Sequence, residues 1–222
     1  MSLRPDLKVD WCTHDAAKYA VEHWHYSRRM PSSFAKLNKL GVWENGKFIG
    51  SLVFSLGSNR NIGAPYRLGC GEICELVRVA LTKHKTPTSR IVAIGVRMIY
   101  AEYETMRLIV SYAASCEGHI GTLYQAGNWL YIGGVKGGAS YCVNGRLMLN
   151  RAVDCSGIDK STLQKVPGTM RYKYIYPLDA EMRAQVEPLR RPYPKRAESI
   201  ASDASADQAE EGGATPTPAL SH

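Results

Sequence analysis

The sequence predicts an α+β fold in which a mixed central β-sheet is flanked by helices on both faces. Segments with strand alternation and segments with helical spacing follow one another along the chain, and a hairpin lies near the start. The hairpin argues against a purely parallel, doubly wound sheet, in which a helix joins each strand to the next. With 45% hydrophobic and 22% charged residues, the 222-residue chain has the composition of a globular protein.

The first elements are predicted from local patterns. Residues 7–12 alternate like a short strand, and residues 14–28 carry apolar side chains at helical spacing, with Thr13 as a plausible N-cap. Residues 39–57 contain two apolar runs around an Asn-Gly pair at 45–46, which is the strongest two-residue hairpin signal. This part of the chain therefore predicts a strand, a helix and a hairpin.

Later elements follow a Gly- and Pro-containing loop. Thr86 and Pro87 supply a cap and a first-turn proline for a second long helix. We assign the remaining connection, which is rich in glycine, no regular structure. The other predicted elements are strands at 73–81, 107–114, 129–135 and 170–178 and helices at 86–103 and 119–129, the last ending at Gly127.

Charge is distributed unevenly along the chain. Residues 195–222 are small and polar and predict a disordered acidic tail, with two basic and five acidic residues. The net charge of the whole chain is +8, so residues 1–194, the predicted folded domain, carry +11. Such a domain favours an anionic partner. The six cysteines are predicted to be free thiols, and the chain shows neither a signal-peptide pattern nor a membrane-spanning run, which predicts an intracellular protein.

Residues 75–94 combine a strand, a basic loop and a helix N-terminus. Unpaired N–H groups and the positive end of the helix dipole are suited to hold a phosphate there. A solvated, capped turn is an equally good interpretation. In the preceding strand, Glu75 and Arg78 are three residues apart and are expected to point to opposite faces. Arg78 lies between Val77 and Val79, and it either forms a structural ion pair with an acidic residue elsewhere or has a functional role in the site.

Two further groups of residues are candidates for chemistry. His25 and Tyr26 end the first helix, where they act either as an acid/base pair or metal ligand, or as part of a cationic last turn. Ser111 ends a buried strand and Tyr124 faces it from the next helix, where a phenol can protonate a departing thiolate. Simple packing is the alternative for Tyr124.

Five strings carry a resemblance to known proteins: HYSRRMP (25–31), LGVWENGKFIGSLVFSLG (40–57), ELVRVALTKHKTPTSRIVAI (75–94), SYAASCEGHIGTLYQAGNWLYIG (111–133) and RYKYIYPL (171–178). The strand, phosphate loop and helix resemble the GCN5-related N-acetyltransferase (GNAT) fold. Together the strings resemble the Mom DNA-modification proteins of Mu-like phages, over about residues 20–180.

This resemblance implies a function. Mom proteins add a carbamoylmethyl group to adenine N6 in phage DNA, which protects it from restriction in the cytoplasm of the bacterial host, and acetyl-CoA and iron are associated with them. The implied catalytic residues are His25, Tyr26, Arg78, Ser111 and Tyr124. The implied cofactor-binding residues are Val77, Val79, Lys83, Thr88, Ser89, Arg90 and Asn128, and the candidate metal ligands are His25 and His119.

The chain departs from these patterns in two places. The family usually has Ser-Tyr-Ala-Asp where this chain has Ala114 in the fourth position. The wider GNAT fold has a Gly-containing pyrophosphate loop, whereas residues 83–90 contain no glycine. These departures motivate an alternative function as a non-catalytic DNA-binding protein. A GNAT acyltransferase acting on a protein or small amine is a second alternative.

A DNA substrate imposes requirements of its own. Adenine N6 is a weak nucleophile and is paired in duplex DNA, so the enzyme must flip the base or take single-stranded DNA. The candidate stacking residues are Trp24, Phe34, Trp43 and Tyr66, and the candidate phosphate-binding residues are Arg28, Arg29, Lys36, Lys39, Arg60 and Arg67.

The product constrains the donor. Acyl transfer joins N6 to a carbonyl carbon, whereas the carbamoylmethyl group joins N6 to a CH2. One hypothesis is metal-assisted chemistry at the methyl carbon of acetyl-CoA. The other is a glycyl donor such as glycyl-tRNA, because glycyl-N6 is an isomer of the product and needs only a rearrangement.

Overall fold

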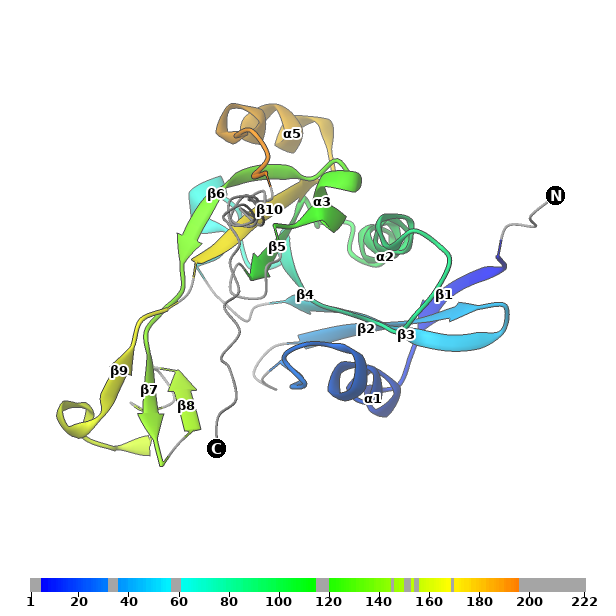
Figure 1. The fold of residues 1–222 in the computed structure, drawn as a ribbon. Coiled ribbons are helices and arrows are strands. Elements are labelled where there is room, and N and C mark those ends of the chain that lie inside the picture. The colour runs from blue at the N-terminus through cyan, green and yellow to red at the C-terminus, as the bar shows by residue number, and fades with distance from the viewer. Residues whose placement is uncertain are drawn as a thin grey trace, which may run out of the picture.

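The computed structural model describes residues 5–31, 36–56, 61–114, 120–144, 146–149, 153, 156–168 and 170–195. They form a seven-stranded sheet in the order β1-β2-β3-β4-β5-β10-β6 and a separate three-stranded sheet in the order β8-β7-β9 (Figure 1). The strands of the large sheet are β1 (Leu7–Trp11), β2 (Lys36–Glu44), β3 (Lys47–Leu56), β4 (Ile73–Leu81), β5 (Leu108–Ala114), β10 (Met170–Pro177) and β6 (Leu130–Lys136).

The large sheet is mixed, as the sequence predicts. Its described strand pairs are antiparallel except for β4 and β5, which run parallel. The β2–β3 hairpin closes through Asn45 and Gly46, whose φ angles are 52° and 75°. Positive φ at both central residues is what a twisted two-residue hairpin needs, and Asn-Gly adopts it at low cost. The Asn-Gly signal therefore placed the turn correctly.

Helices cover both faces of this sheet. On one face, α1 (His14–Trp24) packs small side chains at helical spacing, including Ala17 and Ala20, against Val53 and Ala80. On the opposite face, α2 (Thr88–Glu102) buries apolar side chains in a core that also receives α3 (Thr122–Ala126). The predicted α+β architecture with helices on both faces is confirmed.

The start of α2 differs from the prediction. Pro87, not Thr86, is the N-cap residue, and no side chain caps the helix. The Thr86 hydroxyl instead donates a hydrogen bond to Glu44 Oε1 at 2.6 Å. The predicted cap was wrong because α2 begins at Thr88, so that Thr86 lies one residue before the N-cap, where its hydroxyl and backbone N–H bind Glu44.

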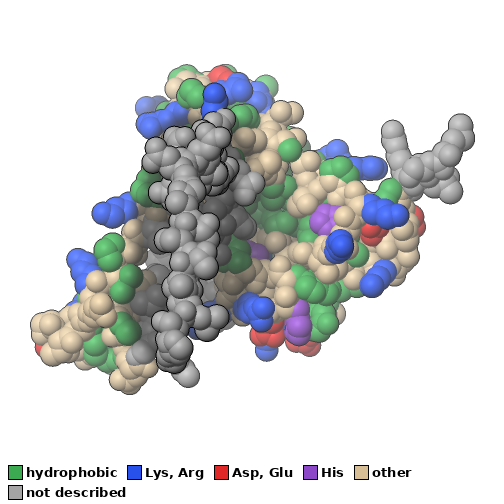
Figure 2. All heavy atoms as spheres, in the orientation of Figure 1, with side chains coloured by type: hydrophobic (Ala, Val, Ile, Leu, Met, Phe, Trp, Pro, Cys, Tyr) green, Lys and Arg blue, Asp and Glu red, His purple; other side chains and the backbone are tan. Residues whose placement is uncertain are grey.

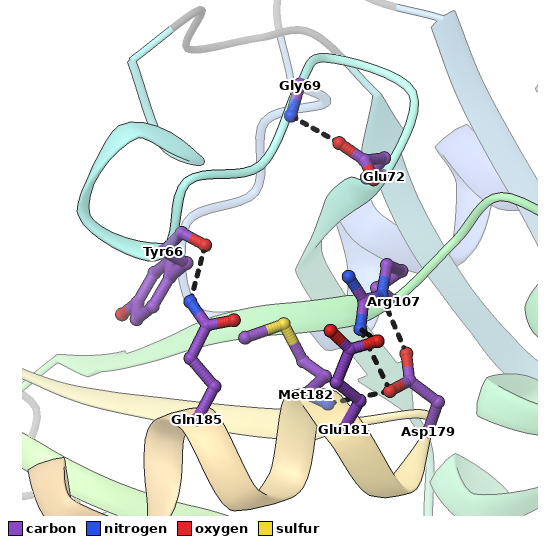
Figure 3. A network of polar contacts seen from close by, with 8 residues as sticks. All are labelled: Tyr66, Gly69, Glu72, Arg107, Asp179, Glu181, Met182 and Gln185. Atoms are coloured by element: carbon purple, nitrogen blue, oxygen red, sulfur yellow. Dashed lines mark hydrogen bonds and ion pairs between the residues drawn. The ribbon is translucent and has the colours of Figure 1, made fainter.

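The C-terminal part of the fold includes elements that the sequence patterns missed. Helix α5 (Ala180–Val186) is capped by Asp179, which also binds Arg107 through Nε (2.9 Å) and Nη2 (3.1 Å) (Figure 3). At its other end, Gln185 Nε2 donates to the Tyr66 carbonyl oxygen at 2.8 Å. These bonds fix α5 against the short helices η1 (Ala64–Tyr66) and η4 (Glu187–Leu189) and the apolar cluster beneath it.

The second missed region is the connection between β6 and β10. It forms β7 (Ser140–Val143), β8 (Arg146–Leu149), η3 (Lys160–Thr162) and β9 (Gln164–Val166). We call this three-stranded sheet the arm, because it projects from the end of β6 and β10, away from α1 and α2 (Figure 1). Among the described helices, none has the length and apolar character to cross a membrane. The predicted acidic tail, from residue 196 onward, lies outside the described residues.

Candidate functional site

The candidate site is a cavity of about 720 Å³ between β4 and β5. Backbone pairing of these parallel strands extends from Ile73↔Leu108 to Leu76↔Ser111 and no further. Beyond that point the strands separate, and the cavity is lined by residues 76–79 of β4, residues 112–114 of β5, residues 120–124 around α3, and residues 24–26 at the end of α1. The sheet thus contains a split that opens between helices of its two faces.

A β-bulge accompanies this split. Val53 of β3 pairs with Arg78 and Phe54 pairs with Leu76, so Val77 is an extra residue in β4. Leu76 and Val79, three apart, consequently both pack into the core beneath α2.

The bulge also changes the faces on which charged residues lie. Glu75 and Arg78 interact electrostatically. Their neighbours Cys74, Leu76 and Val79 pack beneath α2, and Arg78 bonds the segment after α1, so both charged side chains lie on the sheet face opposite α2. The expectation that they point to opposite faces was wrong, because it assumed unbroken alternation.

Ser111 and Tyr124 meet at the apex of the split. The Ser111 hydroxyl donates to the Leu76 carbonyl oxygen at 2.7 Å and shares a hydrogen bond of 2.6 Å with the Tyr124 hydroxyl. Both residues are buried, and burial raises the pKa of Tyr124 to about 12. Gly121 has a φ of 80°, and a Cβ there would lie 2.3 Å from the Tyr174 ring. Only glycine therefore lets α3 begin close enough to bring Tyr124 to Ser111.

His25 and Tyr26 form the wall contributed by α1. The His25 ring is buried and lies 4.2 Å from the Tyr26 ring, which is 51% exposed. The Ser27 backbone N–H donates to His25 Nδ1 at 3.1 Å, and Ser27 Oγ lies 2.8 Å from the same nitrogen. Because Nδ1 accepts the backbone N–H, neutral His25 carries its proton on Nε2. In this tautomer the Nε2–H group is the hydrogen-bond donor of the ring.

Arg78 joins β4 to the end of α1. Its Nε donates to the Arg29 carbonyl oxygen at 3.1 Å, and one terminal nitrogen donates to the Val77 carbonyl oxygen at 2.7 Å. Burial lowers the pKa of Arg78, while Tyr26 and Glu75 act in the opposite direction. Burial likewise raises the pKa of Glu75, an effect opposed by Arg171, Arg78 and Lys173. The partly buried guanidinium of Arg78 therefore borders the cavity and interacts electrostatically with the carboxyl group of Glu75.

The loop before α2 is held by an internal anion. Glu44 accepts hydrogen bonds from the backbone N–H groups of Lys85 and Thr86 as well as from the Thr86 hydroxyl. These bonds lower the pKa of Glu44, with the Thr86 hydroxyl as the largest cause. His84 contacts the Thr82 carbonyl oxygen and Thr88 Oγ1. Two of the donors expected to face a phosphate are thus already used by the protein.

Comparison with known proteins identifies the family and the fold. The model of the Mom protein family matches residues 6–195. The chain belongs to the Mom protein family. No curated protein matches the chain.

Similar solved structures include Arabidopsis thaliana NAA60 with a bisubstrate analogue (9% identity, TM-score 0.53, covering 78% of this chain and 100% of that one). The same plant protein with acetyl-CoA gives 11% identity and a TM-score of 0.51, covering 78% and 99%. A probable acetyltransferase from Staphylococcus epidermidis gives 10% and 0.45, covering 79% and 100%. At such identities the likeness concerns the fold, which is GNAT-like.

The predicted cofactor-binding residues of this Mom-family chain fall into three places. Val77 and Val79 line the cavity. Around the N-terminus of α2, Lys83 and Arg90 are exposed and Thr88 and Ser89 are half-buried. Asn128 lies beyond α3, exposed and with a φ of 58°, and does not line the cavity.

The predicted DNA-binding residues are also dispersed. Arg28 and Arg29 directly follow the cavity wall and are exposed, whereas the Lys36 ammonium lies 5.1 Å from the ring centroid of Tyr103. Lys39 is also on β2, and Arg67 follows η1. Arg60 lies outside the described residues.

Only one described stacking candidate lines the cavity. That residue is Trp24. Trp43 lies near the C-terminal end of β2, where it packs against Phe48, and does not line the cavity. Tyr66 is buried beneath Lys173, whose ammonium lies 4.9 Å from the ring centroid. Phe34 lies outside the described residues.

The candidate metal ligands do not form a recognisable site in the part that the structure describes. There, no three His, Cys, Asp or Glu side chains gather as metal ligands, and His119 is outside it. Metal binding through His25 Nε2 would require the proton to move to Nδ1, which accepts the Ser27 N–H. The described residues therefore do not fit an iron centre.

Sequence reasoning missed four residues at or beside this site. The first is Ser27, whose backbone N–H fixes the tautomer of His25. The other three are Tyr112 on β5 and the cations Arg171 and Lys173 on β10, which lie over its ring. Arg171 lies 5.1 Å and Lys173 lies 6.0 Å from the ring centroid of Tyr112, which lines the cavity. The alternation of basic and aromatic residues in RYKYIYP was the available signal, because every second side chain of a strand shares one face.

Proposed function

We propose that this protein modifies the N6 amino group of adenine in DNA, within the cytoplasm of a bacterial host, and that the product is the carbamoylmethyl derivative. The observation that carries this proposal is the cavity in the β4–β5 split, where residues 25–26, Arg78 and Tyr124 converge in a member of the Mom protein family. Its volume of about 720 Å³ is in the range of small-molecule sites.

An acyl donor in the split gives these residues distinct tasks. Adenine N6 attacks the carbonyl carbon of the donor, the new C–N bond forms, and the bond to the leaving group breaks. N6 loses a proton, and the leaving thiolate or alkoxide gains one. Tyr124 is suited to give that proton, because a phenol with a pKa of about 12 remains protonated at neutral pH.

Arg78 and Tyr26 contribute positioning and charge. The developing oxyanion of the carbonyl carries negative charge, which a partly buried guanidinium stabilises more strongly than an exposed one does. The exposed ring of Tyr26 lines the cavity, tilted by 32° against the His25 ring, and offers a flat surface for a flipped base.

The donor is acetyl-CoA or another acyl donor, such as glycyl-tRNA. Arabidopsis thaliana NAA60, a structure with a similar fold, was determined with acetyl-CoA and with a bisubstrate analogue, which supports an acyl donor for this chain. A glycyl donor yields the connectivity of the proposed carbamoylmethyl product by rearrangement, whereas acetyl-CoA requires chemistry at its methyl carbon. Because the described residues do not fit an iron centre, we derive no step through a metal.

The test is mass spectrometry of nucleosides from cells that express the chain. We expect a carbamoylmethyl adenine peak, and we expect Tyr124→Phe to abolish it while the soluble protein remains. Tyr100→Phe is a matched control, since Tyr100 is an exposed tyrosine of α2, remote from the cavity lining. Unmodified adenine with abundant soluble wild-type protein contradicts the proposal.

A second function is favoured by one observation, the presence of Ala114 in the cavity wall where the family usually has an acid. If the acid is needed for transfer to adenine, the chain acts as an acyltransferase on another amine or as a DNA-binding protein without catalysis. Consumption of a thioester donor with amines in the absence of DNA would indicate the first of these. DNA binding without any adenine product would indicate the second.

A further inference from the structure

The arm contributes little to the core of the large sheet. Its strands pair with one another, β7 with both β8 and β9, and it leaves the large sheet only through β6 and β10 (Figure 1). Among its described residues, Val153 alone is fully buried. The described part of the arm therefore buries little apolar surface and adds little to folding stability, which leaves most of its described surface open to solvent.

The arm and its roots carry a net positive charge. Residues 136–173 contain seven Lys and Arg and two Asp, a net charge of +5 within a chain of +8. The described acid, Asp159, accepts hydrogen bonds from the Ser161 backbone N–H at 2.9 Å and from its hydroxyl at 2.7 Å. Lys and Arg side chains are visible along the outer edge of the molecule down to the arm in Figure 2.

One face of the arm combines cations with an aromatic ring. Tyr141 of β7 is the direct cross-strand neighbour of Lys165 and of Met148, so all three side chains share a face. The Lys160 ammonium lies 5.8 Å from the centroid of the Tyr141 ring. Lys165 is exposed.

The cations continue from the arm to the cavity. Lys136 at the end of β6 is exposed and pairs with Met170, and the next residue on β10 is Arg171. Arg171 pairs with Ala114 and lies over the ring of Tyr112, and both of these residues line the cavity. The stretch from Lys165 to Arg171 spans at most about 20 Å when extended, which is roughly half a turn of B-DNA.

We propose that the arm is a docking surface for duplex DNA, in which Lys160 and Lys165 contact backbone phosphates and Arg171 leads the target strand toward the cavity. The inference rests on the proposed function, since it assigns the surface that holds the substrate. Duplex DNA is the occupant because the surface is extended, has an excess of positive charge over the length of several phosphates, and ends at the site. An acidic protein could bind the same positive charge, and the experiment below separates it from DNA.

The experiment compares two double variants of the full chain. Lys160→Gln/Lys165→Gln removes two arm cations, and Lys18→Gln/Lys47→Gln removes two exposed cations on α1 and the β2–β3 turn. Binding to a synthetic duplex of roughly three turns is measured by fluorescence anisotropy over a range of salt concentrations. We expect the arm variant to bind about 10-fold more weakly and its salt slope to fall by about 2, with the control within about twofold of wild type.

The outcomes separate this inference from the proposed function. Equal losses in both variants, or none in the arm variant while wild type binds DNA and modifies adenine, would overturn the docking surface and leave the proposed function intact. A wild-type chain that neither binds nor modifies DNA overturns both, and binding only to acidic protein identifies the other occupant. If the double variant does not fold, Lys165→Gln alone is scored by a fall of about 1 in the salt slope.

Discussion

The Ser111 hydroxyl is expected to hold the apex of the split together, and Ser111→Ala tests this directly. Ser111 is 1% exposed, and its hydroxyl bonds both the Leu76 carbonyl oxygen and the Tyr124 hydroxyl. Alanine leaves the buried carbonyl without this partner, at a cost of about 1–3 kcal/mol. Tyr124 borders the cavity, where water can replace the lost bond, so we expect about 2 kcal/mol of destabilisation in total.

The assay is equilibrium unfolding in urea, supported by thermal melting. A loss of about 2 kcal/mol lowers the Tm of a domain of this size by about 4–8 °C. Ser51→Ala is the matched control, because Ser51 is fully buried on β3 and its hydroxyl has no hydrogen-bond partner in the described structure. We expect that control to leave the free energy of unfolding unchanged or slightly higher.

A double-mutant cycle isolates the bond between the two hydroxyls. Tyr124→Phe keeps the ring against Trp129 and Tyr174 and leaves Ser111 bonded to Leu76, so it should cost only about 0.5–1.5 kcal/mol. The double variant should lose less stability than the sum of the single variants. If Ser111→Ala is no more destabilising than Ser51→Ala, or if the two effects are strictly additive, the role assigned to the apex is refuted.

Three further predictions concern other parts of the molecule. Arg78→Ala should abolish adenine modification in the nucleoside assay while circular dichroism shows a folded protein; a loss of solubility instead would make Arg78 structural. Glu44→Gln should loosen the loop before α2 by weakening the bonds to Thr86, seen as faster amide exchange there. The folded pKa of Glu44 lies below its ordinary value of 4.5, so the stabilising effect of its carboxylate is present above pH 4.5 and is lost as the pH falls through the folded pKa. In acid, the free energy of unfolding of the wild type should therefore fall more steeply than that of the Gln variant. Equal slopes for the two proteins would contradict this. Gly168→Ala should weaken DNA binding without lowering the Tm of the domain, because its Cβ would lie 1.9 Å from the Gly137 carbonyl oxygen and must displace the arm; unchanged affinity would argue against the arm.

Sequence reasoning placed the strands of the large sheet because their signals are local. The Asn-Gly turn at 45–46 and the apolar alternation around it depend on neighbouring residues alone, and the hairpin formed where predicted. The Thr86 cap failed for the opposite reason, since its hydroxyl is bonded to Glu44, a residue distant in sequence. The arm was missed because its strands have three or four residues each, which is too few to show a clear period.

The bulge explains why the roles of Arg78 could not be separated from the sequence. In ICELVRVAL, apolar residues occupy both faces, so inserting one residue leaves no mark on the pattern. That insertion accompanies the opening between β4 and β5 and brings Arg78 to the face on which α1 ends. There its Nε bonds the Arg29 carbonyl oxygen, while its guanidinium borders the cavity. One side chain thus ties the segment after α1 to β4 and also borders the cavity, so the structural contact of Arg78 and the catalytic role proposed for it are consequences of the same insertion.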